Sequence, residues 1–135
     1  MFPADTPLDD IRSYWMGDDK HTYVAEQGGR VVGAFVFRQN RIGLGSHIGN
    51  ASYIVDPDYH GRGIGKSMGL YSLSEAKKLG FHALQFNMVV STNAAAVKLW
   101  QALGFKIMGT IPKAFRHKNH GLVDVYIMYR SLDDV

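Results

Sequence analysis

Residues 54–66 constrain this chain most, because they set three closely spaced glycines between two segments of different periodicity. The segment before them, residues 51–55, is rich in β-forming side chains and ends at Pro57, which cannot donate to a sheet ladder. The segment after them, residues 63–79, has apolar side chains near helical spacing and is followed by Gly80. We therefore predict a strand, a glycine-rich turn and a long helix in that order.

The glycines of this turn predict an anion site. Gly61, Gly63 and Gly65 would let the backbone approach a ligand without collision of a Cβ atom, and the first amides of the helix would point at that ligand. A pyrophosphate suits such a helix start, and Arg62 or Lys66 could add charge-assisted contacts. A glycine-rich turn that binds no ligand is the alternative.

Two other phosphate-binding patterns fail by their spacing. The Walker A motif ends in Gly-Lys-Ser, as residues 65–67 do, but its first glycine would fall on His60. The dinucleotide fingerprint would follow Gly61 and Gly63 with a glycine at position 66, where the chain has Lys66. Binding of a nucleoside triphosphate is therefore the weakest of the ligand hypotheses.

The rest of the chain predicts an α/β (α+β) protein whose elements are joined by short turns. A nearly unbroken apolar run at residues 83–91 is typical of a central strand covered on both faces. A polar loop with Arg116, His117 and His120 is expected between the last two strands. The predicted order is a helix at 7–16, strands at 22–26, 30–38 and 51–55, a helix at 63–79, a strand at 83–91, a helix at 93–103, and strands at 105–110 and 124–129.

Composition limits the class of protein. With 135 residues, 46% of them hydrophobic, we expect residues 1–135 to form a single domain. The chain has no cysteine, which excludes disulfides, thiolate zinc sites and cysteine nucleophiles. Its net charge of +3 is spread along the chain, which favours a small phosphate-bearing ligand over nucleic acid. Without a membrane-length apolar run or a signal peptide, we expect a cytoplasmic protein with no membrane partner.

Two motifs together resemble the GNAT family of N-acetyltransferases. Residues 60–65, His-Gly-Arg-Gly-Ile-Gly, match both glycine positions of the family signature, although His60 replaces its usual Arg or Gln. Residues 91–105 are similar to the second motif, with Asn93 before a helix and Gly-Phe after it. The chain looks nearest to bacterial GNAT proteins of undefined substrate and to fungal proline-analogue acetyltransferases, which share the run Asn-x-x-Val-Ser-Thr-Asn at residues 87–93.

The resemblance implies a GNAT fold, with a mixed, mostly antiparallel, splayed sheet flanked by helices and an N-terminal strand apparently absent. It implies acetyl-CoA as co-substrate and no metal, and the two histidines of the polar loop lack a third ligand. A homodimer would cover the sheet edge left by the absent strand. The implied cofactor contacts are the backbone of Ile54 and Val55, the turn residues His60, Gly61, Arg62, Gly63, Ile64, Gly65 and Lys66, and Asn93.

The implied reaction is direct attack of an amine on the thioester in a ternary complex. Many family members protonate the leaving thiolate with a tyrosine, but this chain has Trp100 there, which we expect to be a packing residue. Asn50, Tyr53 and Asn87 are the catalytic candidates, and each also has a structural interpretation. Asn87 is an amide in an apolar strand, where it needs hydrogen-bond partners. It has two equally supported interpretations: a core amide with its partners in the protein, or a contact to the substrate or the oxyanion.

The acceptor is expected to be the amine of a small molecule or amino acid. Arg116 would pair with an acceptor carboxylate, a role suited to a planar bidentate donor, unless its loop is merely solvated. Asp124 would orient a histidine or the acceptor amine. A non-catalytic module of the same fold that binds acyl-CoA is the alternative function.

Overall fold

The computed structural model describes residues 20–39, 45 and 47–135. The helix predicted at residues 7–16 lies outside the described residues. Every element predicted within them is present, although its ends differ by several residues in places. The elements are β1 (His21–Gln27), β2 (Arg30–Gln39), β3 (Ile48–Val55), the short helix η2 (Pro57–Tyr59), α2 (Ile64–Lys78), β4 (Ala83–Val90), α3 (Ala94–Ala102), β5 (Lys106–His117) and β6 (Gly121–Ser131).

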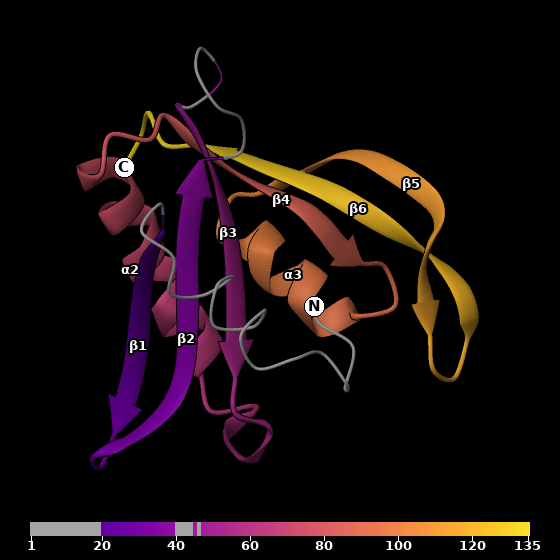
Figure 1. The fold of residues 1–135 in the computed structure, drawn as a ribbon, viewed down its shortest axis with the longest axis horizontal. Coiled ribbons are helices and arrows are strands. Elements are labelled where there is room, and N and C mark those ends of the chain that lie inside the picture. The colour runs from indigo at the N-terminus through magenta and orange to yellow at the C-terminus, as the bar shows by residue number, and fades with distance from the viewer. Residues whose placement is uncertain (1–19, 40–44, 46) are drawn as a thin grey trace.

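The strands form one six-stranded sheet in the order β1-β2-β3-β4-β6-β5. Neighbouring strands are antiparallel except β3 and β4, which are parallel, so the expectation of a mixed, mostly antiparallel sheet is confirmed. The pairing of β3 with β4 extends only from Ile48 opposite Ala83 to Asn50 opposite Gln85. Beyond Asn50 the two strands diverge, as Figure 1 shows, and the sheet is splayed as expected.

The hairpin between β1 and β2 turns at two adjacent glycines. Gly28 and Gly29 have φ of 59° and 79°. A two-residue turn that matches the twist of the flanking strands needs positive φ at both positions, which glycine adopts without cost.

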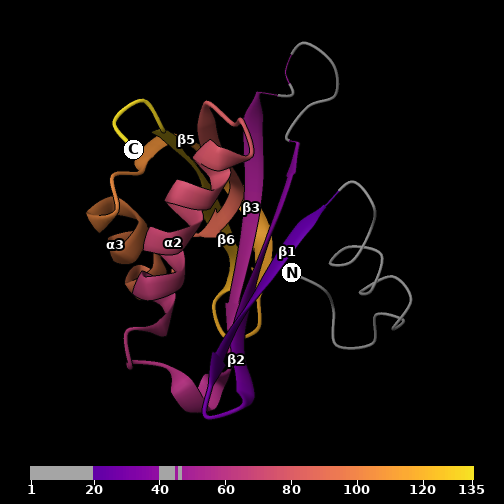
Figure 2. The ribbon, with the colours of Figure 1, turned by 90° about the vertical axis from the view of Figure 1, so that its left-hand side faces the viewer.

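The two α-helices in the described residues, α2 and α3, cover the same face of the sheet (Figure 2). They can approach closely because α2 has Gly69 at their contact, where a Cβ atom would overlap Leu103 and lie 3.3 Å from Trp100. The indole of Trp100 is 8% exposed, and its ring centroid lies 4.6 Å from that of Tyr53 and 4.7 Å from that of Phe86. Trp100 therefore packs the helices onto the diverging strands, as expected.

Two expectations about the strands are wrong. The apolar run of β4 is not covered on both faces, since Asn87 is exposed and Met88 is 51% exposed. The segment around Arg116 is not a loop, because β5 continues to His117 and β6 begins at Gly121. Among the described residues, no helix is both long enough and apolar enough to cross a membrane.

Candidate active site

The glycine turn has a backbone that only glycine adopts readily. Gly61 and Gly63 have φ of 77° and 78°, and a Cβ atom built on either would meet no atom within 4 Å. These two glycines are therefore required by the path of the chain, and they leave open space beside it. Gly65 differs, because its φ is not positive and its Cβ atom would lie 3.4 Å from the side chain of Leu99 on α3, an ordinary van der Waals distance. Neither the backbone nor the packing therefore requires the third glycine of the motif.

The N-terminus of α2 fits a pyrophosphate. Gly63 is the N-cap residue, and no side chain caps the helix. The backbone N–H groups of Ile64, Gly65 and Lys66 in the first turn can therefore bind another acceptor, at the positive end of the helix dipole. Arg62 and Lys66 are both exposed beside these amides. The residues present thus suit the phosphates of a nucleotide-containing cofactor.

The chain before the turn is anchored by side chains. Asp56 accepts a hydrogen bond from the backbone N–H of Asp58 at 2.9 Å, which caps η2, and pairs with Arg30 at 3.3 Å. The guanidinium of Arg62 lies 4.9 Å from the ring centroid of Tyr59, a cation–π contact. These contacts fix where the glycine turn leaves the sheet.

His60, the residue that departs from the family signature, folds back onto the end of β3. Its Nε2 lies 3.2 Å from the backbone oxygen of Val55. A carbonyl oxygen can only accept, so Nε2 carries the proton in this arrangement. The imidazole thus occupies one lone pair of the carbonyl at the mouth of the diverging strands.

The end of β3 turns alternate backbone groups toward β4. The N–H of Asp56 donates to the oxygen of Val32 on β2 at 2.8 Å. Bonded and non-bonded pairs alternate along an antiparallel ladder, so Ile54 also bonds to β2, whereas the backbone groups of Tyr53 and Val55 point to the β4 side. The expected cofactor contact through the backbone therefore suits Val55 and Tyr53, and Ile54 is not placed for it.

β4 has a bulge where it diverges from β3. Phe86 pairs with Met128 and Val89 with Tyr126, so two β4 residues, Asn87 and Met88, oppose one residue of β6. Such a bulge bends its strand and redirects side chains. Here it brings the amide of Asn87 to the surface, so Asn87 is not a core amide.

A polar cluster lies on the sheet face opposite the helices, at the point of divergence. Asn50 and Gln85 form the last pair of β3 and β4, and the side-chain nitrogen of Gln85 donates to Oδ1 of Asn87 at 3.0 Å. Asn50 is 5% exposed. The structure thus brings Asn50 and Asn87 together around Gln85, a residue that the sequence analysis missed. Gln85 could have been found from the sequence, because it lies two residues before Asn87 in an apolar strand and this spacing puts both amides on one face.

Tyr53 lies on the helix face instead, away from that cluster. Ser72 Oγ donates to the oxygen of Gly69 at 2.7 Å, so its single proton is used and Tyr53 Oη is the donor in their 2.6 Å contact. Burial raises the pKa of the Tyr53 hydroxyl, an effect that the bond to Ser72 partly opposes. A buried phenol with a raised pKa is a poor proton donor to a thiolate and a poor base at neutral pH.

Asn93, which precedes a helix in the second motif, is the N-cap residue of α3. Its Oδ1 accepts a hydrogen bond from the backbone N–H of Ala96 at 3.2 Å. Because the side-chain oxygen is used in the cap, a cofactor contact of Asn93 would come from its side-chain nitrogen, and that contact stays a prediction.

The two predicted acceptor residues lie on the β5–β6 hairpin. Arg116 is exposed and pairs with Leu122 near the hairpin turn. Asp124 is half-buried, and its Oδ1 accepts a hydrogen bond from the backbone N–H of Lys113 at 3.0 Å. Within the part of the chain that the structure describes, no group of three His, Asp or Glu side chains could hold a metal ion.

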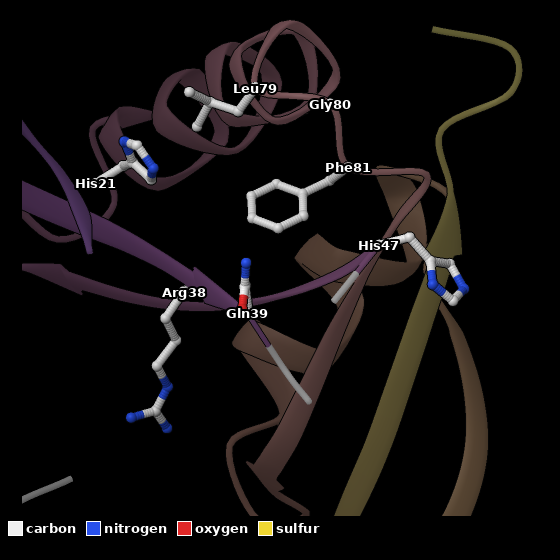
Figure 3. Close-up of a pocket in the computed structure, with 7 residues that line it drawn as sticks. All are labelled: His21, Arg38, Gln39, His47, Leu79, Gly80 and Phe81. Atoms are coloured by element: carbon white, nitrogen blue, oxygen red, sulfur yellow. The ribbon is translucent and has the colours of Figure 1, made fainter. Parts of the chain in front are cut away.

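A cavity lies at the far end of α2 from the glycine turn. It measures about 370 Å³ and is lined by polar side chains around Phe81 (Figure 3). The guanidinium of Arg38 and the imidazole of His47 point in different directions in this view, away from the ring. Because its polar groups do not converge, this cavity does not form a chemical site comparable with the splayed strands.

The sequence model of the acetyltransferase (GNAT) family matches residues 2–105 of this chain. Together with the splayed sheet and the uncapped glycine turn, this match shows that the chain belongs to the GNAT family.

Similar proteins of known sequence or structure support this family membership. A GNAT N-acetyltransferase from Kribbella flavida is 40% identical and superimposes with a TM-score of 0.91 over 97% of this chain and 80% of that chain. The N-acetyltransferase aca1 of Schizosaccharomyces pombe is 38% identical over 108 residues, which are 77% of this chain and 52% of aca1. This chain thus spans about half the length of that relative. The protein yncA of Salmonella typhimurium, whose structure includes its cofactor acetyl-CoA, is 27% identical with a TM-score of 0.76 over 92% of this chain and 69% of that chain.

Proposed function

We propose that this protein is an acetyl-CoA-dependent N-acetyltransferase that acetylates the amine of a small molecule or amino acid by direct attack in a ternary complex. The observation that carries the proposal is that an uncapped, glycine-rich helix start lies beside two strands that diverge. The helix start suits a pyrophosphate, and the diverging strands suit the arm that carries the thioester. The acetyl-CoA bound to the Salmonella relative supports the same cofactor here.

The cofactor residues divide by the kind of contact they can make. The amides of Ile64, Gly65 and Lys66 would hold the pyrophosphate, with Arg62 and the Lys66 ammonium as charged partners. The backbone groups of Tyr53 and Val55 on the β4 side would pair with the pantetheine amides. Acetyl-CoA supplies the activated acetyl thioester when bound.

The polar cluster of Asn50, Gln85 and Asn87 would provide the hydrogen bonds next to the reacting atoms. Asn87 would hydrogen-bond the oxygen that gains charge, or the acceptor. This proposal is supported by the bond from Gln85 to Asn87 Oδ1, which leaves the N–H groups of Asn87 for another partner. Asn50 closes the cluster at the last strand pair. Tyr53 and Trp100 have packing roles, so we assign the amine's proton and the thiolate's proton to water.

A non-catalytic module that binds acyl-CoA is the second candidate. It is favoured by one observation, namely that a buried tryptophan fills the position where many family members have their tyrosine acid. Retained CoA binding with no product would support it. A cytoplasmic location and a homodimer are further proposals from the sequence.

The first experiment measures thermal stability with acetyl-CoA, CoA, ATP and NAD at equal concentrations, because a ligand that binds only the folded state raises the melting temperature. Free-thiol release is then followed with L-leucine, L-leucinamide, spermidine and a lysine-containing peptide. A rise with both CoA forms and thiol release with an amine supports the transferase. A rise without release supports the binding module. The absence of a rise with either CoA form contradicts both.

Gly63→Ala tests the anion cradle. An alanine there is strained by about 1–2 kcal/mol at positive φ and adds a methyl group beside the phosphates, so Kd for acetyl-CoA should rise at least about tenfold. Gly80→Ala is the matched control, since Gly80 has φ of 93° and open space at the other end of α2. It should lower stability similarly and leave Kd unchanged. Equal Kd values for the two variants would remove the cradle from the proposal.

A further inference from the structure

The β5–β6 hairpin contains a strained bulge. Ile111 pairs with Val125 and Phe115 with Val123, so the three residues at positions 112–114 oppose one residue of β6, Asp124. Within this bulge Lys113 has φ of 54°, and no other non-glycine residue in the described ranges has a positive φ. A lysine is strained in this conformation, so the bulge persists only if other contacts hold it.

Asp124 provides those contacts. Its carboxylate accepts the backbone N–H of Lys113 at 3.0 Å, a charge-assisted hydrogen bond to the strained residue itself. Its backbone oxygen accepts the N–H of Ser91, just after β4, also at 3.0 Å. One residue therefore ties the bulge of β5 to the end of the strand that carries Asn87.

The bulge decides where the outer part of the hairpin lies. A bulged strand bends, and Figure 1 shows β5 and β6 curving together past the end of β4. Arg116 and the hairpin turn lie on this outer part. The turn is itself ordered, because His117 Nδ1 accepts backbone hydrogen bonds from Asn119 and His120 at 3.0 Å and 3.2 Å.

We propose that Asp124 is a positioning residue for acceptor binding, which acts by holding the Lys113 bulge and does not itself contact the acceptor amine. Through the bulge it sets the bend of the hairpin arm that carries Arg116, next to the end of β4. This inference rests on the proposed transferase function for its kinetic consequence, but its structural part is independent of any reaction.

Two substitutions separate this role from a charge role. Asp124→Asn keeps an Oδ1 that can accept from Lys113 and loses the negative charge, whereas Asp124→Ala loses both. With the panel amine that gives the fastest thiol release, Asp124→Ala should raise the acceptor KM about tenfold and leave the KM of acetyl-CoA unchanged. Asp124→Asn should stay within about threefold of the parent. Equal losses in both variants would indicate direct contact with the amine and overturn the proposal.

A second readout needs no acceptor. Hydrogen exchange of the amides at residues 112–123 should be faster in Asp124→Ala than in the parent protein and near the parent rate in Asp124→Asn. In the double variant Asp124→Ala with Lys113→Gly, glycine relieves the strain and should return part of the protection. Asp133→Ala, at an exposed aspartate near the C-terminus, is the control and should change nothing.

The outcomes are distinguishable from those of the proposed function. Unchanged exchange in Asp124→Ala overturns the positioning role, whatever the activity. Faster exchange in a protein that neither binds acetyl-CoA nor releases thiol would support the positioning of the hairpin and contradict the transferase.

Discussion

The two faces of β3 and β4 differ in the chemistry of their side chains. On the helix face the rings of Tyr53 and Phe86 pack against Trp100 in tilted and edge-to-face contacts and fill the space between sheet and helices. On the opposite face, three residues before Tyr53 and one after Phe86, Asn50 and Asn87 bring amides to the point where the strands part. Because successive side chains of a strand point to opposite faces, one face of these two strands can pack the core while the other presents polar groups.

Trp100→Ala should give the largest effect, because it removes the ring that packs against both diverging strands. We expect a loss of about 3–5 kcal/mol in the free energy of unfolding, measured by urea denaturation with the m-value fitted. Asn87→Ala is the control from the other face and should change that free energy by about 0.5 kcal/mol or less, as for an exposed residue. Similar losses for the two variants would erase the division between the faces.

Asn87→Ala should instead act on catalysis. If its amide stabilises the charge that develops on oxygen, kcat should fall about 100-fold, as for removal of one preorganised donor. Steady-state thiol release measures this, and the acetyl-CoA melting shift shows whether binding is intact. Gln85→Ala should give a smaller loss, because it only removes the partner of Asn87 Oδ1. A kcat within twofold of the parent for Asn87→Ala would take the polar cluster out of the mechanism.

Tyr53→Phe should have the smallest effect. It removes the hydroxyl that donates to Ser72 while the ring remains, so we expect a stability loss of about 1 kcal/mol. Activity should change less than threefold, because the hydroxyl lies on the helix face. A large loss of kcat with unchanged stability would restore Tyr53 as a catalytic residue. The pH dependence of kcat between pH 6 and 9 should also be the same in both proteins, since the pKa of Tyr53 is raised away from this range.

Much of the fold was predictable because it depends on local chemistry. The glycines before α2 indicated a turn between a strand and a long helix, and the apolar run at residues 83–91 indicated a further strand. The family resemblance supplied the splay of the sheet, which no local pattern contains.

The errors lie where strand pairing decides the outcome. The bulge that exposes Asn87 and Met88 is a shift in register between β4 and β6, and neither strand shows it alone. The same holds for the outer half of the β5–β6 hairpin, whose polar composition indicated a loop although its backbone is paired up to His117. The single domain and the individual site roles stay predictions.

The contact between His60 and Val55 has a consequence for the energetics of binding. The carbonyl of Val55 already has a donor before a cofactor amide arrives. A carbonyl oxygen has two lone pairs, so a pantetheine N–H would find one of them still available. Because the imidazole already holds this oxygen in place, docking of the arm there would require little further ordering of the chain.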